Sequence, residues 1–102
     1  MSLFHYTDQT GHLAIRSQVV WRFLANQPPG NHPVGAYFTS LDRGTKNLAL
    51  RLRIPKAKIG YFFKFSGAGD LSPLPGGRGR YILYSPQDYS VDPSRQIDEG
   101  VT

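Results

Sequence analysis

The chain has 102 residues, which suits one small domain with a modest hydrophobic core. It contains no cysteine, and this excludes a disulfide framework and a thiolate metal site. No apolar run approaches the roughly 20 residues that a membrane-spanning helix needs, and no charged-then-apolar leader is present. We therefore expect one soluble, cytoplasmic domain over residues 1–102, with no membrane partner. The excised end of a longer protein is an equal alternative.

The net charge of +5 is spread unevenly along the chain. The stretch from Arg43 to Lys64 carries only basic charged residues, whereas acidic residues gather in the C-terminal tail. A block of one sign favours an anionic partner, such as nucleic acid or a phosphorylated ligand. The alternative is a solvated face that keeps a small protein in solution.

The first third of the chain predicts two strands and one helix. We expect a strand at residues 3–6, then a short helix that Asp8 or Thr10 caps and that turns Leu13 and Ile15 toward the core. Residues 19–24 are β-branched and aromatic, which is typical of a strand.

A loop and a strand follow at the centre of the chain. Residues 26–33 hold three prolines and one glycine, which exclude a helix or a central strand and favour a surface binding loop. Residues 36–39 predict the third strand. Asp42 is then a turn or N-cap residue ahead of a helix at residues 45–52, because Leu48 and Leu52 share one helical face.

The second half predicts strands joined by one long loop. Residues 59–65 are almost continuously apolar or aromatic and indicate a central strand. Residues 67–79 are a loop rich in glycine and proline, and residues 80–84 are a fifth strand. Weaker strand character follows at 89–91 and 96–97. The sum is an α+β domain, with helices on a twisted, mostly antiparallel sheet or split pair of sheets.

Few residues carry a recognisable chemical pattern. The three histidines, His5, His12 and His32, do not pair at metal-ligand spacing, so we expect no metal site. There is no glycine-rich phosphate loop and no nucleophile elbow. His5 is either a satisfied core residue or, at the edge of a sheet, a residue whose imidazole bonds a ribose hydroxyl.

Two short stretches together resemble a known fold. Residues 3–7 read Leu-Phe-His-Tyr-Thr, and residues 35–40 read Gly-Ala-Tyr-Phe-Thr-Ser. In this order and at this separation they resemble the ADP-ribosyltransferase fold, and more closely the His-Tyr-Asp branch of bacterial polymorphic-toxin ADP-ribosyltransferases. A later strand in that branch is similar to residues 81–86. The resemblance implies a small ADP-ribosyltransferase-like domain of split, mostly antiparallel sheets with two short helices.

The resemblance also implies an NAD site. His5 would bond the adenosine ribose, Tyr37 would stack on the nicotinamide ring, and Arg22 would pair with the pyrophosphate. The proline-rich loop through His32 would cover the donor. The NAD-binding residues implied in this way are His5, Tyr6, Thr7, Arg22, Gly35, Tyr37 and Phe38.

At the third catalytic residue the chain departs from the pattern of many relatives. Many relatives place a glutamate directly before a strand like residues 81–84, and this chain has Arg80 there. The His-Tyr-Asp branch uses an aspartate, for which Asp88 is our choice, so that His5, Tyr37 and Asp88 form the expected catalytic set. The other candidates are Asp42, Asp92 and Asp98, and each of these aspartates has a structural role as an alternative.

The expected function is NAD-dependent ADP-ribosyl transfer to a protein or nucleic-acid acceptor, with release of nicotinamide and no metal. A toxin effector delivered into a target cell's cytoplasm, restrained by an immunity or antitoxin protein, is the setting that the resemblance implies. Water as the acceptor would make the chain an NAD glycohydrolase. A further alternative is a non-catalytic module that binds nucleic acid through its basic face and aromatics such as Trp21 or Tyr61.

Overall fold

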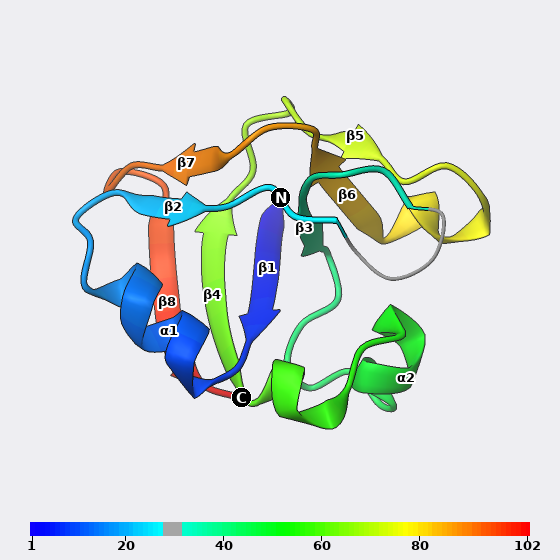
Figure 1. Cartoon of the computed structure of the whole chain (residues 1–102), viewed down its shortest axis with the longest axis horizontal. Helices are drawn as coiled ribbons and strands as arrows, with labels where there is room; N and C mark the ends of the chain where they lie inside the picture. Colours follow the sequence, from blue (N-terminus) through cyan, green and yellow to red (C-terminus); the bar gives the residue numbers. More distant parts are fainter. Residues whose placement is uncertain (28–31) are drawn as a thin grey trace.

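The computed structural model describes residues 1–27 and 32–102, and its elements are drawn in Figure 1. Two α-helices, two short 3-10 helices and eight strands form in this part of the chain. In order they are β1 (Ser2–Thr7), α1 (Gln9–Arg16), β2 (Trp21–Phe23), β3 (Ala36–Thr39), α2 (Leu48–Leu52), η1 (Lys56–Ile59), β4 (Tyr61–Ser66), β5 (Ser72–Pro73), η2 (Gly77–Arg80), β6 (Ile82–Ser85), β7 (Tyr89–Val91) and β8 (Gln96–Val101).

The strands form two antiparallel sheets, as the α+β prediction requires. The larger sheet has the order β5-β6-β3-β1-β4-β8, and β2 pairs with β7 in the smaller one. β1 is paired with β4 along its whole length, but its register with β3 holds a single pair, Phe4 with Thr39. The sheet therefore opens between β1 and β3 beyond this pair.

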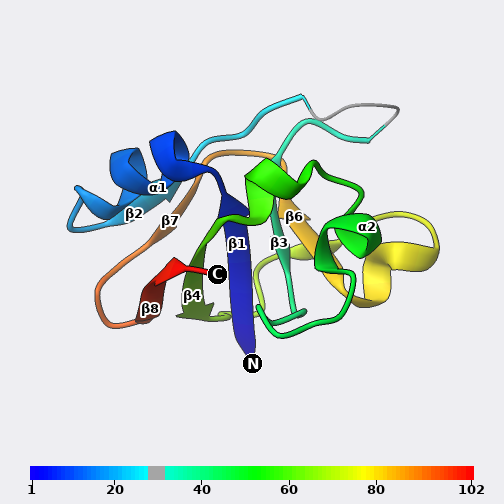
Figure 2. The same ribbon diagram turned by 90° about the horizontal axis from the view of Figure 1, so that it is seen from below.

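Each face of β1 and β4 carries its own apolar cluster, because successive residues of a strand point to opposite faces. The larger cluster lies under β2, β7 and α1, and the smaller one lies under α2. Figure 2 shows the two helices on either side of these strands. The larger cluster consists of Leu3, Trp21, Phe23, Ala36, Phe38, Phe63, Phe65, Tyr89 and Val91, and the smaller of Phe4, Tyr6, Leu48 and Phe62.

The prediction that Leu13 and Ile15 of the first helix face the core is partly wrong. Asp8 caps α1 by accepting a hydrogen bond from the Gly11 N–H at 2.9 Å, and Ile15 packs on the larger cluster. Leu13, however, is 53% exposed, whereas His12 is 5% exposed. Residues three apart share a helical face, so the face that buries Ile15 also buries His12, and Leu13 points to solvent.

Other expected boundaries also move. The second helix begins at Leu48 and not at residue 45, because the Asp42 carboxylate closes a turn by accepting from the Gly44 N–H at 3.1 Å. The fifth strand begins at Ile82, because residues 77–80 form η2. Trp21 is 5% exposed and therefore offers no ring to a nucleic acid, contrary to the binding-module alternative.

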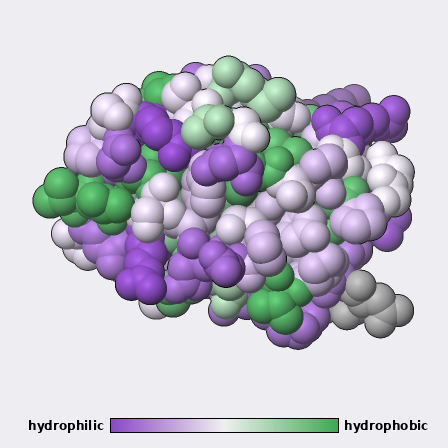
Figure 3. All heavy atoms as spheres, turned by 90° about the horizontal axis from the view of Figure 1, so that it is seen from above, coloured by the Kyte–Doolittle hydropathy of each residue, from purple (hydrophilic) through white to green (hydrophobic). Residues whose placement is uncertain are grey.

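The surface is mixed in character. Figure 3 shows hydrophilic residues interspersed with small apolar patches over one face of the molecule. Within the described residues, no helix is long and apolar enough to cross a membrane.

Candidate functional site

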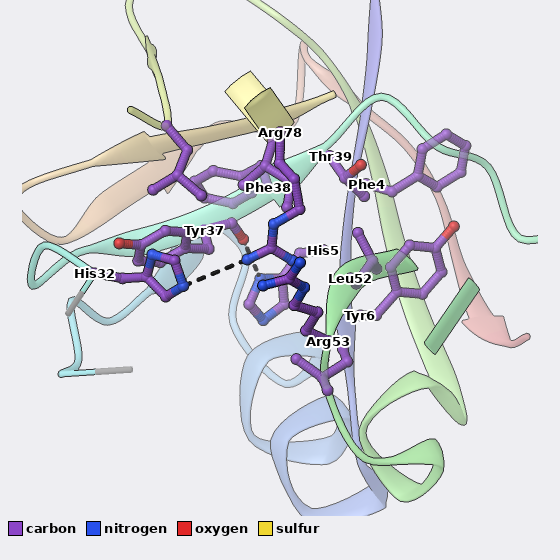
Figure 4. A pocket seen from close by; sticks show the side chains of 13 residues that line it. Phe4, His5, Tyr6, His32, Tyr37, Phe38, Thr39, Leu52, Arg53 and Arg78 are labelled. Atoms are coloured by element: carbon purple, nitrogen blue, oxygen red, sulfur yellow. Dashed lines mark hydrogen bonds between the residues drawn. The ribbon is translucent and has the colours of Figure 1, made fainter. Parts of the chain in front are cut away.

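A cavity of 430 Å³ lies where the sheet opens between β1 and β3 (Figure 4). Its size falls in the ordinary range of small-molecule sites. The walls come from β1, β3, the end of α2 and the chain around η2. Its aromatic and histidine lining is Phe4, His5, Tyr6, His32, Tyr37 and Phe38, and the remaining residues that line it are Thr39, Leu52, Arg53, Ile54, Leu74, Arg78 and Ile82.

His5 and Tyr37 both line this cavity although strand alternation assigns them to opposite faces of the sheet. His5 shares its face with Phe38, whose ring centroid lies 5.7 Å away, while Tyr37 points to the other face. The strands separate beyond Phe4 and Thr39, so the imidazole fills the gap between them. β1 lies between β3 and β4, so the prediction that His5 lies at a sheet edge is wrong.

The proton of His5 is fixed by its backbone partner. Nδ1 lies 3.1 Å from the Tyr37 carbonyl oxygen, which can only accept, so Nδ1 carries the hydrogen. Burial lowers the pKa of His5 below its usual value of 6.5, and the bond to this carbonyl opposes that shift more weakly. The imidazole is therefore neutral near pH 7, and its Nε2 can accept a hydrogen bond.

The Tyr37 ring is held from two directions. It stacks on Tyr84 with ring centroids 5.5 Å apart and planes at 18°, and its hydroxyl donates to the Pro33 carbonyl oxygen. Burial of the phenol raises the pKa of Tyr37. The ring is thus presented to the cavity in a fixed orientation.

Tyr6 lines the same cavity, but its hydroxyl is already engaged. The hydroxyl donates to the Leu41 carbonyl oxygen at 2.8 Å. Burial raises the pKa of Tyr6, and the charge of nearby Asp42 raises it further. Tyr6 therefore offers its ring rather than its hydroxyl to a ligand.

Two arginines give the cavity a positive charge. The Arg78 guanidinium lies 3.3 Å from His32 Nε2 and 3.4 Å from the Arg51 carbonyl oxygen, which orient it. Arg53 follows α2 in a left-handed backbone conformation, with φ of 55°. Figure 4 shows both side chains reaching into the cavity beside His5.

A second cavity, of 280 Å³, lies on the other side of His5 and is more polar. It is bordered by one face of α1, by β2 and by the chain that follows β2. His5 lines this cavity as well as the first. The residues around it are His5, Thr7, Gly11, Ala14, Ile15, Gln18, Arg22, Phe23, Leu24 and Asn26.

The structure thus divides the expected NAD-binding residues between two cavities. His5, Tyr6, Tyr37 and Phe38 line the first, and Thr7 and Arg22 line the second with His5. Gly35 lines neither. Of the proline-rich loop, residues 28–31 lie outside the described residues.

Asp88 also lines neither cavity. Its carboxylate pairs with the Arg22 guanidinium at 3.0 Å and accepts from the Ala25 N–H at 2.8 Å. The bond from Ala25 and then the bond from Arg22 lower the pKa of Asp88. The residue expected to hold the pyrophosphate is therefore the ion-pair partner of the expected catalytic aspartate.

The remaining aspartate candidates have local roles. Asp42 and Asp92 close turns by accepting from Gly44 and Ser94, and Asp98 accepts from the next N–H in its strand. Among the described residues, no acidic side chain lines either cavity. The arrangement can bind an aromatic or anionic ligand, but it brings no carboxylate to the cavity walls.

Sequence reasoning missed the cavity roles of Arg53 and Arg78. Arg53 is one member of the basic stretch from Arg43 to Lys64, and Arg78 belongs to the loop rich in glycine and proline that the sequence predicts at residues 67–79. The available signal was the excess of basic over acidic residues, which does not single out positions.

Comparison with known proteins found no match among protein-family models, curated proteins or solved structures. The ADP-ribosyltransferase fold therefore remains a prediction from two short motifs.

Proposed function

We propose that the chain binds NAD and breaks its nicotinamide–ribose bond, passing ADP-ribose to an acceptor. The observation that carries this proposal is the position of His5, which lines both cavities. A residue shared by two neighbouring cavities suits a ligand with two halves. The nicotinamide half is assigned to the aromatic cavity with Tyr37, and the adenosine half to the polar cavity with Thr7 and Arg22.

The side chains of the aromatic cavity suit the first part of this reaction. A fixed Tyr37 ring can hold the leaving nicotinamide by stacking, which is worth about 0.5–1.5 kcal/mol beyond area burial. The neutral His5 can accept a bond from a ribose hydroxyl through Nε2. Together they would orient the glycosidic bond for attack. Part of the entropic cost of bringing the reacting groups into position would then be met when NAD binds.

A second candidate function has one observation in its favour. ADP-ribosyl transfer passes through a positively charged ribose, which a carboxylate normally stabilises. No acidic side chain of the described chain lines either cavity. The domain would then hold NAD without efficient transfer.

The test is release of free nicotinamide from NAD, measured by chromatography. We expect release by the wild-type chain and a loss of about tenfold or more in Tyr37→Ala, because the stacking surface is removed. Tyr37→Phe is the matched control, since it keeps the ring and loses only the bond to Pro33. It should remain close to wild type.

Equal release by Tyr37→Ala and wild type would contradict the assigned role of the ring. Calorimetric binding of NAD without any nicotinamide release would select the second candidate. An absence of NAD binding by a folded wild-type chain would remove both.

A further inference from the structure

The guanidinium groups of Arg53 and Arg78 share one cavity without a carboxylate. Within the described residues the ion pairs involve other basic side chains, namely His12, Arg16, Arg22 and Lys58. Two positive charges that line the same cavity repel each other, and an anion bound between them offsets this repulsion. The cavity is therefore suited to an anionic group next to its aromatic wall.

The geometry around both arginines favours binding of an anion. Arg78 is oriented by His32 Nε2 and the Arg51 carbonyl oxygen, both of which accept from it. Arg53 lines the cavity from a left-handed position directly after α2, a backbone conformation that is costly for an arginine and free of that cost for glycine. A planar guanidinium fork matches the oxygens of a phosphate.

We propose that Arg53 and Arg78 hold the phosphate monoester of a nucleotide or of a nucleic-acid end, and that this phosphate is the acceptor of ADP-ribose. The acceptor part rests on the proposed function above, whereas the binding part stands on the cavity alone. The shared chemistry is a terminal phosphate, whether it belongs to a free nucleotide or to a longer strand.

A phosphate acceptor fits a cavity that has no acidic lining. A phosphate dianion would attack C1′ of the nicotinamide-bearing ribose as the C1′–N1 bond breaks. The electron pair of that bond neutralises the pyridinium, and neutral nicotinamide leaves. The new ester is a monoanion, so charge balances without proton transfer. A hydroxyl or water acceptor would instead have to lose a proton to a general base.

The charge around the cavity favours nucleic acid over protein as the source of the phosphate. Arg51, Lys56 and Arg80 are exposed and flank the two cavity arginines in the chain. The Arg51 guanidinium lies over the Tyr81 ring at 5.6 Å, and Tyr81 follows Arg80 in the chain. A basic rim attracts the repeated phosphates of a strand in a salt-dependent way.

The binding test compares a short single-stranded RNA carrying a 5′-phosphate with the same RNA ending in a hydroxyl, by fluorescence anisotropy. We expect the phosphorylated strand to bind at least tenfold tighter, and Arg78→Gln to remove this preference. Arg80→Gln is the matched control, because it removes the same charge from the same 3-10 turn but does not line the cavity. As a rim residue it should weaken binding of both strands alike and leave the preference for the 5′-phosphate unchanged. Equal affinity for both strands would overturn the proposal.

Arg53→Gly gives a second variant whose folding is not in question. Glycine adopts the left-handed backbone freely, so the melting temperature should not fall, while the phosphate preference should drop as in Arg78→Gln. A preference that survives in this variant would exclude Arg53 from the site. A 5′-mononucleotide tests the free nucleotide as the source of the phosphate. If it displaces the 5′-phosphorylated RNA at a concentration similar to that of unlabelled RNA, the site recognises the phosphate itself.

The acceptor step is tested separately with labelled NAD. We expect label on the 5′-phosphorylated RNA and none on its hydroxyl-ended twin. Nicotinamide release with no labelled RNA would overturn the acceptor assignment and leave the proposed function intact. Binding of the 5′-phosphate with no release of nicotinamide would overturn the proposed function and leave the phosphate site intact. Preferential labelling of protein would also overturn the assignment of the phosphate as acceptor. The same holds if Arg78→Gln loses as much affinity for NAD as it loses for the 5′-phosphorylated RNA.

Discussion

Gly35 shows how one residue can matter to the site without touching it. A Cβ added there would lie 2.4 Å from the Ser85 carbonyl oxygen, in the backbone of the neighbouring strand β6. That strand cannot move away without breaking its pairs with β3, which carries Tyr37. The resemblance assigned Gly35 to NAD binding, and the structure gives it a close approach between strands.

We therefore expect Gly35→Ala to lower the free energy of unfolding by about 1–3 kcal/mol, measured by urea denaturation. Gly77→Ala is the control, because nothing lies within 4 Å of a Cβ there and its φ is not positive. Equal free energies of unfolding for Gly35→Ala and Gly77→Ala would show that β6 moves away from the added methyl group without loss of stability.

At this scale the two motifs allowed part of the site to be predicted. The resemblance assigned His5 and Tyr37 to one NAD site, and both side chains line one cavity. Arg78 could not be predicted, because its position depends on the turn at η2 and on contacts with His32 and Arg51, which are remote in the chain. Hydrophobic pattern and motif spacing carry no information about such contacts.

At the scale of elements, α1 is held by an interaction that its apolar pattern does not reveal. His12 Nε2 forms a short hydrogen bond with the Glu99 carboxylate of β8, and its ring stacks on Tyr61 with centroids 4.7 Å apart. Leu13, which the pattern turned inward, is 53% exposed. A polar pair thus ties helix α1 to β8, the strand at the edge of the sheet.

His12→Ala should lower the free energy of unfolding by about 1–3 kcal/mol, since it removes a buried ring and leaves Glu99 without that partner. Leu13→Ala, one position away, should change it by less than about 0.5 kcal/mol. Urea denaturation of both variants measures the difference. The reverse ranking would mean that α1 packs as the apolar pattern suggested.

Strand prediction succeeded where burial was high and fell short where it was low. β4 reads as a strand because its aromatic residues are buried on both faces. β8 runs from Gln96 to Val101, yet only its first two residues carried strand character. It is an edge strand paired with β4 alone, and edge strands tolerate charged residues such as Asp98.

For the whole molecule, the decisive feature is the opening of the sheet between β1 and β3. Composition and periodicity supported a small α+β domain with antiparallel strands, which is what forms. They could not reveal that β1 and β3 share one residue pair, because register between distant strands is set by tertiary packing. The cavities on either side of His5 follow from that opening.

The half-buried His5 makes the stability of the whole fold depend on pH. Its pKa is lowered in the folded chain by burial, from 6.5, so below about pH 6.5 the unfolded chain binds a proton that the folded chain does not. The stabilising effect of neutral His5 is therefore present above pH 6.5 and is lost as the pH falls below it. The limiting loss for one group is about 1.4 kcal/mol per pH unit.

We expect the urea midpoint of the wild type to fall between pH 7 and pH 5, and His5→Gln to show a smaller fall because its side chain does not titrate. Asp8, Asp88 and Asp92 do not interfere in this range. Hydrogen bonds lower the pKa of each of them, so their contribution is lost only as the pH falls below about 4. Equal slopes for the variant and the wild type would show that His5 takes up its proton without unfolding the chain.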